Sequence, residues 1–333
     1  MSIDIKTSSI EPLRHTFANV ARRLGADKPA SRYLEAMYDL QPTVNFHYRP
    51  LWDSEHELYD TGRTRIAMED WYALKDPRQY YYGTWVMTRS RQQEVAERNF
   101  AFVEKRKLLG TMSEASRDKA AKLLVPLRHL EYAANLNNTY ICAYGYGTAT
   151  TQAAMFTGMD RLAIAQYLSR IGLMIDGNSA ETLDAGKQAW TDEPLWQPLR
   201  QLAEELMVQK DWFELLVAQD YVLDGLLYPL VYDRIDAVFE RESGAGLSML
   251  TEFMSEWYTE HCRWTDAVLK VAAKESDANK QQIEQWINAW MPRVAAALAP
   301  VAEYGLGGEA QSVMSELQDE LKARAAKKSG LDL

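Results

Sequence analysis

Histidine and carboxylate side chains are the groups in this sequence that could support metal-dependent chemistry. A carboxylate-bridged di-iron site in a helical bundle needs a Glu from each of two helices and a Glu-x-x-His pair from each of two others, because positions i and i+3 project together into the core. The five histidines are His15, His47, His56, His129 and His261. Only Asp53 and His56 approximate the required spacing, and they lie outside the helical part. The pattern therefore does not build this site.

Three carboxylates nevertheless border or interrupt apolar helical segments. Glu131 precedes a stretch without charges, Asp224 lies within an apolar run, and Glu256 lies between Met254 and Trp257. Taken singly, each could be a surface group at the edge of an apolar face. Together they indicate one carboxylate on each of several central helices, as in the remnant of a four-helix metal site. Motifs of serine hydrolases, zinc peptidases, thiol redox enzymes and P-loop proteins are absent from the sequence.

Long helices are the elements that would position these groups. The chain has 17 glycines and 11 prolines in 333 residues, about 8% against an average of about 12%. Helical patterns continue almost without interruption from Gly83, which predicts an all-α bundle. Expected helices run from Ser113 toward Tyr144 with a kink at Pro126, over 148–174, 211–241 and 247–274, and around 283–294 and 313–321.

One stretch of this bundle has no charged residue. The 28 residues from Tyr132 to Met159 contain no Asp, Glu, Lys, Arg or His. Several Asn and Thr side chains make the stretch too polar for a membrane helix. A helix pair without a charged face is expected to be buried nearly all round, in the middle of the bundle.

The first 80 residues have a different character. They contain Pro12, Pro29, Pro42, Pro50 and Pro77 among scattered aromatic residues, with only short helical patterns. Such a segment could be an arm lying along another protein, anchored by aromatic side chains, or an irregular layer packed on its own chain. We expect an N-terminal arm over 1–82, a bundle over 83–275, and C-terminal helices of the same domain over 276–333.

Charge and cysteine usage limit the possible partners and the compartment. The formal net charge is −10 and the sequence pI is about 5.2, so nucleic acid and anionic membrane surfaces are unfavourable partners. The segment from Met1 to His15 has no apolar core of a signal peptide, and no apolar run reaches the length of a membrane span. Cys142 and Cys262 are expected to be free thiols, which favours a cytoplasmic location.

The central segments resemble a known family. Glu131–Ala134 and Asp160–Gln166 are similar to the paired helices of bacterial multicomponent monooxygenase hydroxylases, whose catalytic alpha subunits carry a D-E-x-R-H-x-Q motif. Asp160 and Gln166 keep this frame. The resemblance places Arg161 at a Glu ligand position and Ile164 at a His position.

The second half shows the same loss of ligands. Ser255–Thr259 resembles the other D-E-x-x-H segment, with Glu256 kept and Thr259 in place of the histidine, while Asp224 falls near the fourth carboxylate position. A guanidinium at a ligand position is incompatible with two adjacent iron ions. The resemblance therefore implies the beta subunit: a ferritin-like bundle without catalytic residues, metal ligands or cofactor.

The N-terminal region agrees with this resemblance. Asn45–Trp52 and Glu69–Tyr82 are similar to the beta-subunit arm, and the similarity to the phenol hydroxylase beta subunit exceeds that to the toluene and alkene members. The resemblance implies an alpha subunit holding the di-iron centre, a gamma subunit, a symmetric dimer of trimers, an NADH-dependent reductase and a regulatory protein. The 10 Trp and 18 Tyr residues suit a permanent interface.

Two further hypotheses concern the core and the function. Arg161 is expected to reach Glu131, and either Glu256 or Asp224, in a buried ion network. The alternatives to a structural subunit are a self-contained metalloenzyme using Glu131, Asp224, Glu256 and His261, and a metal-free helical adaptor outside any oxygenase. On the helix, His261 is about 140° from Glu256 and faces largely elsewhere.

Overall fold

The computed structural model describes residues 16–42 and 49–333, and this part of the chain contains helices and no strand. The prediction of an all-α bundle is confirmed. The α-helices are α1 (Ala18–Leu24), α2 (Arg32–Glu35), α3 (Tyr82–Arg106), α4 (Glu114–Leu124), α5 (Leu127–Tyr144), α6 (Thr148–Ile175), α7 (Glu181–Asp192), α8 (Gln197–Met207), α9 (Trp212–Leu216), α10 (Asp224–Pro229), α11 (Asp236–Ser243), α12 (Gly246–Glu275), α13 (Asp277–Leu306) and α14 (Ala310–Arg324).

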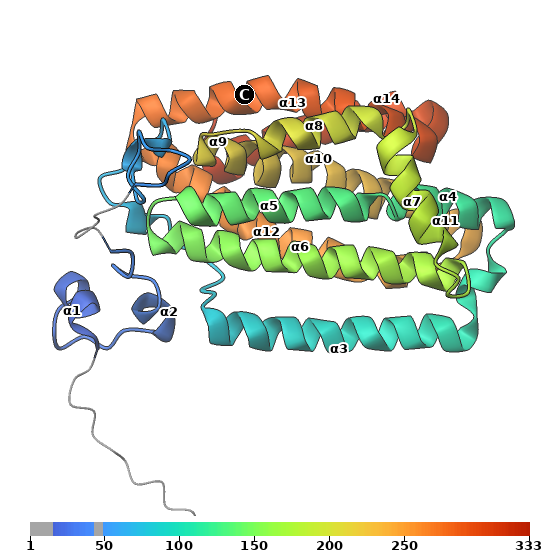
Figure 1. Cartoon of the computed structure of the whole chain (residues 1–333), viewed down its shortest axis with the longest axis horizontal. Helices are drawn as coiled ribbons and strands as arrows, with labels where there is room; N and C mark the ends of the chain where they lie inside the picture. The colour runs from blue at the N-terminus through green and yellow to red at the C-terminus, as the bar shows by residue number, and fades with distance from the viewer. Residues whose placement is uncertain (1–15, 43–48) are drawn as a thin grey trace, which may run out of the picture.

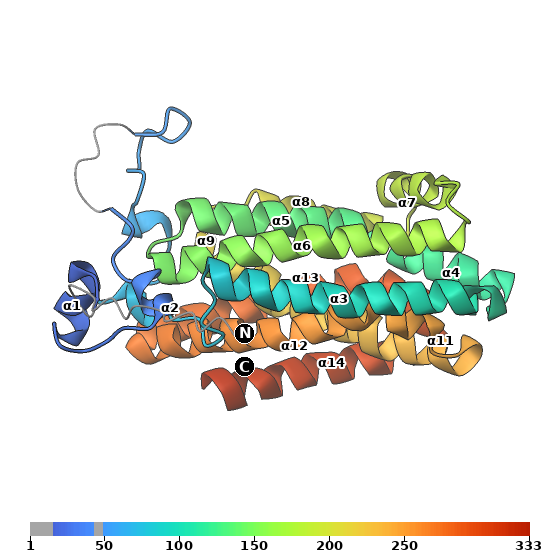
Figure 2. The same ribbon diagram turned by 90° about the horizontal axis from the view of Figure 1, so that it is seen from below.

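Helices α5 and α6 form an antiparallel pair through the middle of the bundle (Figures 1 and 2). Ser113 caps α4 by accepting a hydrogen bond from the Ser116 amide, as expected from the sequence. Pro126 ends that helix instead of kinking it, because proline cannot donate the next hydrogen bond, and α5 begins at Leu127. Gly147, with φ of 85°, makes the turn into α6 in a backbone conformation that favours glycine.

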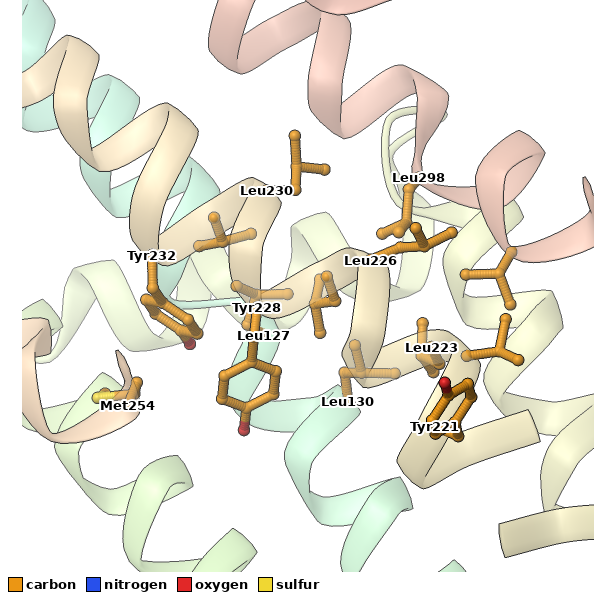
Figure 3. Close-up of a cluster of buried hydrophobic side chains, with 14 of the residues drawn as sticks. Leu127, Leu130, Tyr221, Leu223, Leu226, Tyr228, Leu230, Tyr232, Met254 and Leu298 are labelled. Atoms are coloured by element: carbon orange, nitrogen blue, oxygen red, sulfur yellow. The ribbon is translucent and has the colours of Figure 1, made fainter. Parts of the chain in front are cut away.

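The expected helix over 211–241 is a succession of helical pieces. Asp211 caps α9, which continues into the π-helical segment η4 (Val217–Leu223), then α10, the π-helical segment η5 (Leu230–Ile235) and α11. Wider π turns are frequent at functional sites, because they change which side chains face inward. Figure 3 shows the leucines around this segment, with the Tyr228 hydroxyl directed away from Leu226, Leu230 and Leu298.

Helices α12 and α13 complete the bundle, and α14 lies along its outside (Figure 2). Buried side chains of α5, α6, α12, α13 and α14 belong to one hydrophobic core. Helix α3 runs beside α6, where Trp85 stacks on Phe156 with ring centroids 5.2 Å apart (Figure 1). None of the helices in the described ranges is long and apolar enough to cross a membrane.

The charge-free pair is not buried all round, contrary to the expectation. Tyr132 and Leu136 of α5 are exposed, as are Met155, Met159 and Leu162 of α6; Tyr132 keeps 55% and Met159 44% of its accessible surface. The spacing of i, i+4 and i+7 places each set on one stripe of its helix. We call these five residues the charge-free face. The helices lack charges there although that face meets solvent in the isolated chain.

The N-terminal segment packs only partly on the bundle. Val20, Tyr33, Met37 and Tyr38 form a small second core, which reaches the rest of the chain through Tyr72 and Ala149. The expected helical patterns here are confirmed as the short helices α1 and α2. Part of the Asn45–Trp52 segment, His15 and His47 lie outside the described residues.

Candidate functional site

The guanidinium of Arg161 lies at the centre of a buried group of charges between α5, α6 and the segment η4–α10. Its Nη1 donates hydrogen bonds to Glu131 Oε2 at 3.3 Å and to the Tyr228 hydroxyl at 3.0 Å. Its Nη2 donates to Asp220 Oδ1 at 3.2 Å and to Asp224 Oδ2. The exposed fraction of each of these charged side chains is 2% or less. We call Glu131, Arg161, Asp220, Asp224 and the adjacent His261 the ionic cluster.

Neutral groups donate further hydrogen bonds to the carboxylates, two of them to oxygens that Arg161 does not bind. Tyr228 donates its hydroxyl to Glu131 Oε1 at 2.8 Å. Asn138 donates to Asp220 Oδ1 at 3.0 Å, and Gln219 donates to Asp224 Oδ1 at 3.3 Å. Such hydrogen bonds offset part of the cost of burying carboxylates.

Trp257 of α12 covers one side of the Arg161 guanidinium. The guanidinium carbon lies 4.5 Å from the indole ring centroid, a cation–π contact. The indole Nε1 donates to Asp160 Oδ2 at 2.9 Å, and Asp160 also accepts hydrogen bonds from both Arg89 and Trp85. Asp160 thereby fixes the ring that Arg161 stacks on.

Only some of the site residues predicted from the sequence are in contact with one another. Glu131, Arg161 and Asp224 are in contact, as expected. Ile164 lies one turn along α6 from Arg161 and is fully buried.

Glu256 and Thr259 are exposed on α12, so of the two expected partners of Arg161, Glu256 and Asp224, only Asp224 joins the network. The inward stripe of this helix passes through Trp257 and His261, four residues apart. Glu256 is about 100° away from that stripe.

Sequence reasoning missed Asp220 and named His261 only for the metalloenzyme alternative. Asp220 lies four residues before Asp224 in the same apolar run, and His261 lies four residues after Trp257. Both spacings place side chains on one helical face, which is the signal that could have identified them. His261 faces away from Glu256, as expected, and that direction is the centre of the bundle.

Burial dominates the electrostatics of the cluster. It raises the pKa of Glu131 from 4.5 to about 7 and that of Asp220 from 3.8 to about 7, although Arg161 opposes the shift in both. Burial also raises the pKa of Asp224. For His261, burial first and the nearby Arg161 charge second lower the pKa well below 6.5, which favours neutral imidazole.

These shifts predict that the free energy of unfolding depends on pH. The variant Glu131→Gln should reduce this pH dependence. Between pH 4.5 and about 7 the folded chain keeps a proton on Glu131 that the unfolded chain has lost. The associated stability is therefore fully present below pH 4.5 and is lost as the pH rises through about 7. Urea unfolding at pH 5, 6 and 7 measures how the free energy of unfolding falls as the pH rises. This fall should be smaller in the variant than in the wild type, by up to about 1.4 kcal/mol per pH unit.

Glu256→Gln is the matched control for that measurement, because it removes an exposed carboxyl outside the cluster. In Glu256→Gln the free energy of unfolding should fall with rising pH as much as it does in the wild type. Equal pH dependence in the Glu131 variant and the wild type would show that Glu131 does not hold this proton.

Asp220, Asp224 and His261 are also the described side chains with the geometry of metal ligands, since one donor atom from each lies within 4.8 Å of the others. Two iron ions nevertheless do not fit this cluster. The Arg161 guanidinium contacts both aspartates, and Ile164 offers no donor atom. A fixed cation in this place repels a pair of metal cations.

Comparison with known proteins gives consistent relatives. The sequence model of the methane/phenol/alkene hydroxylase family matches residues 52–276. The chain is 50% identical over 307 residues to the phenol 2-monooxygenase oxygenase component DmpL of Pseudomonas sp. (strain CF600), with 92% of each chain covered. It is 24% identical over 232 residues to the beta subunit of the toluene-4-monooxygenase hydroxylase component of Ectopseudomonas mendocina, with 68% of this chain and 70% of that one covered.

A solved structure agrees with these relatives. The fold superimposes on a chain of phenol hydroxylase from Pseudomonas sp. OX1 with a TM-score of 0.93, at 50% identity and with 99% of each chain covered.

Proposed function

This chain belongs to the methane/phenol/alkene hydroxylase family, and we propose that within it the chain is the non-catalytic beta subunit of a phenol-type hydroxylase. Its fold is the ferritin-like helical bundle, and its relatives are oxygenase components of multicomponent monooxygenases. In this function the chain scaffolds an alpha subunit that inserts one oxygen atom from O2 into an aromatic ring.

The position of Arg161 is the observation that supports the non-catalytic assignment. A positive side chain occupies the centre of the bundle and pairs with Glu131, Asp220 and Asp224. All members of the ionic cluster are almost fully buried, so none meets solvent or a substrate from the surface. The pairing of the acids with Arg161 supports a structural role for the cluster and a di-iron centre in the alpha subunit.

The charge-free face supports a permanent partner. A stripe of large apolar residues on α5 and α6 is exposed in the isolated chain, as is typical of a surface that another subunit covers. We assign this face to the contact with the alpha subunit and the segment 1–82 to an arm on that partner. The complete system includes a gamma subunit, a dimer-of-trimers assembly, a reductase and a regulatory protein, in the cytoplasm.

Iron analysis of the purified full chain tests the assignment. We expect no stoichiometric iron in the chain alone, together with formation of an iron-containing complex and NADH-dependent phenol hydroxylation after co-expression with the alpha and gamma subunits. Stoichiometric iron in the chain alone would favour a self-contained metalloenzyme. Failure to form a complex with a di-iron subunit would favour a helical adaptor outside any oxygenase.

A further inference from the structure

The ionic cluster contains three donor atoms arranged as in a metal site. Nε2 of His261 lies 3.6 Å from Oδ1 of Asp220 and 3.6 Å from Oδ2 of Asp224. Donor atoms about 2.1 Å from a tetrahedral metal ion are separated by about 3.4 Å. The three side chains come from η4, α10 and α12, and each is at most 1% exposed. Their spacing matches that of ligands around one cation.

The surroundings of His261 are a second, independent observation on this arrangement. Its side chain is fully buried, yet neither ring nitrogen has a hydrogen-bond partner. Asp220 Oδ2 is likewise buried without a partner. Buried polar atoms are nearly always satisfied, so unpartnered atoms beside carboxylates require an explanation. The imidazole is held against Trp257, with ring centroids 4.6 Å apart, and its Nε2 is directed at the two aspartates.

Arg161 binds the same two oxygens that face His261. Its Nη2 donates to Asp220 Oδ1 at 3.2 Å and to Asp224 Oδ2. We propose that the guanidinium of Arg161 is a built-in substitute for a divalent metal ion at a site formed by Asp220, Asp224 and His261, and that truncating Arg161 opens this site to a transition-metal ion. Two carboxylates and one imidazole suit Zn²⁺ or Co²⁺.

The chemistry of this exchange balances in charge and in space. Loss of the guanidinium removes one positive charge from beside the three acidic side chains of the ionic cluster. A divalent ion replaces that charge and adds one more positive charge. Glu131 contacts Arg161 Nη1 and provides a further carboxylate beside the larger charge. The inference goes beyond the proposed function, because it concerns the chain's own core and needs no partner subunit.

Cobalt titration of full-length Arg161→Ala tests the proposal. The variant should bind one Co²⁺ with visible d–d absorption, bind Zn²⁺ at least ~100-fold more tightly than the wild type, and melt at a higher temperature when Zn²⁺ is present. Arg161→Met is the matched control, since it removes the charge but fills the space. In Arg161→Ala/His261→Phe the aromatic stack on Trp257 is kept while the imidazole ligand is lost, and the Co²⁺ bands should disappear.

Two outcomes would overturn the proposal. One is a folded Arg161→Ala chain that binds Co²⁺ no better than the wild type. The other is Co²⁺ binding that persists unchanged in the His261→Phe double variant. If Arg161→Ala does not fold without metal, refolding with and without Zn²⁺ becomes the measurement, because a metal site couples binding to folding. Helical circular dichroism should then return only with Zn²⁺, and its failure to return contradicts the site. Iron content of the wild-type chain tests the proposed function separately.

Discussion

Replacing Arg161 with methionine should lower the free energy of unfolding of the chain by roughly 3–5 kcal/mol. Glu131, Asp220 and Asp224 would keep their buried positions without the cation that all three contact. Removal of one partner from a buried ion group is costly because the other charges stay desolvated. Thermal unfolding at pH 7.5 should show a melting temperature about 4–7 °C below that of the wild type.

Arg170→Met is the matched control, since Arg170 lies on the same helix and pairs with Glu97 at the surface. Because that pair is partly exposed, its loss should cost less than about 1 kcal/mol. The cost of Arg161→Met should also shrink at pH 5, where protonation of Glu131 and Asp220 removes the charges left unpaired. A melting temperature equal to the wild type at pH 7.5 would show that the cluster does not depend on its cation.

The pairing of Arg161 with Glu131 could be predicted because both lie on long, regular helices. Helix α5 ends at Tyr144 and α6 begins at Thr148, both within the charge-free run, and the turn at Gly147 makes the two helices antiparallel neighbours. An antiparallel pair brings a residue near the start of one helix beside a residue further along the other. The family resemblance then indicated that Glu131 and Arg161 face inward, and the structure places these two side chains in contact.

The contribution of η4 and α12 was harder to predict for two different reasons. In η4 every residue is buried, so the apolar pattern does not single out an inward face, and only the four-residue spacing to Asp224 points to Asp220. On α12 the resemblance selected Glu256, although the apolar spacing through Met254, Trp257 and Trp264 predicts the face that includes His261. The apolar period was the better guide there.

The charge-free run was interpreted as fully buried because absence of charge and burial usually coincide. Composition alone does not tell whether a neutral face packs on its own chain or on another one. The exposed stripe of α5 and α6 separates the two cases, because no other part of the described chain covers Tyr132 and Met159. Exposing large apolar side chains to water is unfavourable, and a partner subunit that covers this face removes the unfavourable contact with water.

Placing two carboxylates on this face should strongly weaken assembly while leaving the chain folded. Met155→Glu/Met159→Glu changes side chains that are 38% and 44% exposed, and glutamate is a good helix former, so the free energy of unfolding should change by less than about 1 kcal/mol. Burial of two unpaired carboxylates against an apolar partner surface is strongly unfavourable. Binding to the alpha subunit, measured by titration or co-purification, should weaken at least ~100-fold, or by about 2.7 kcal/mol.

Met207→Glu provides a control with the same residue type and similar exposure, 45%, on α8. That variant should assemble normally, because α8 contributes no residue to the charge-free face. Loss of assembly in both variants would point to a general effect of added negative charge on a chain that already carries −10. Normal assembly of the double variant would place the alpha-subunit contact elsewhere, since burying two carboxyl groups in an apolar interface is costly whether they stay charged or take up protons. The double variant and its control thus separate a specific interface from non-specific electrostatic repulsion.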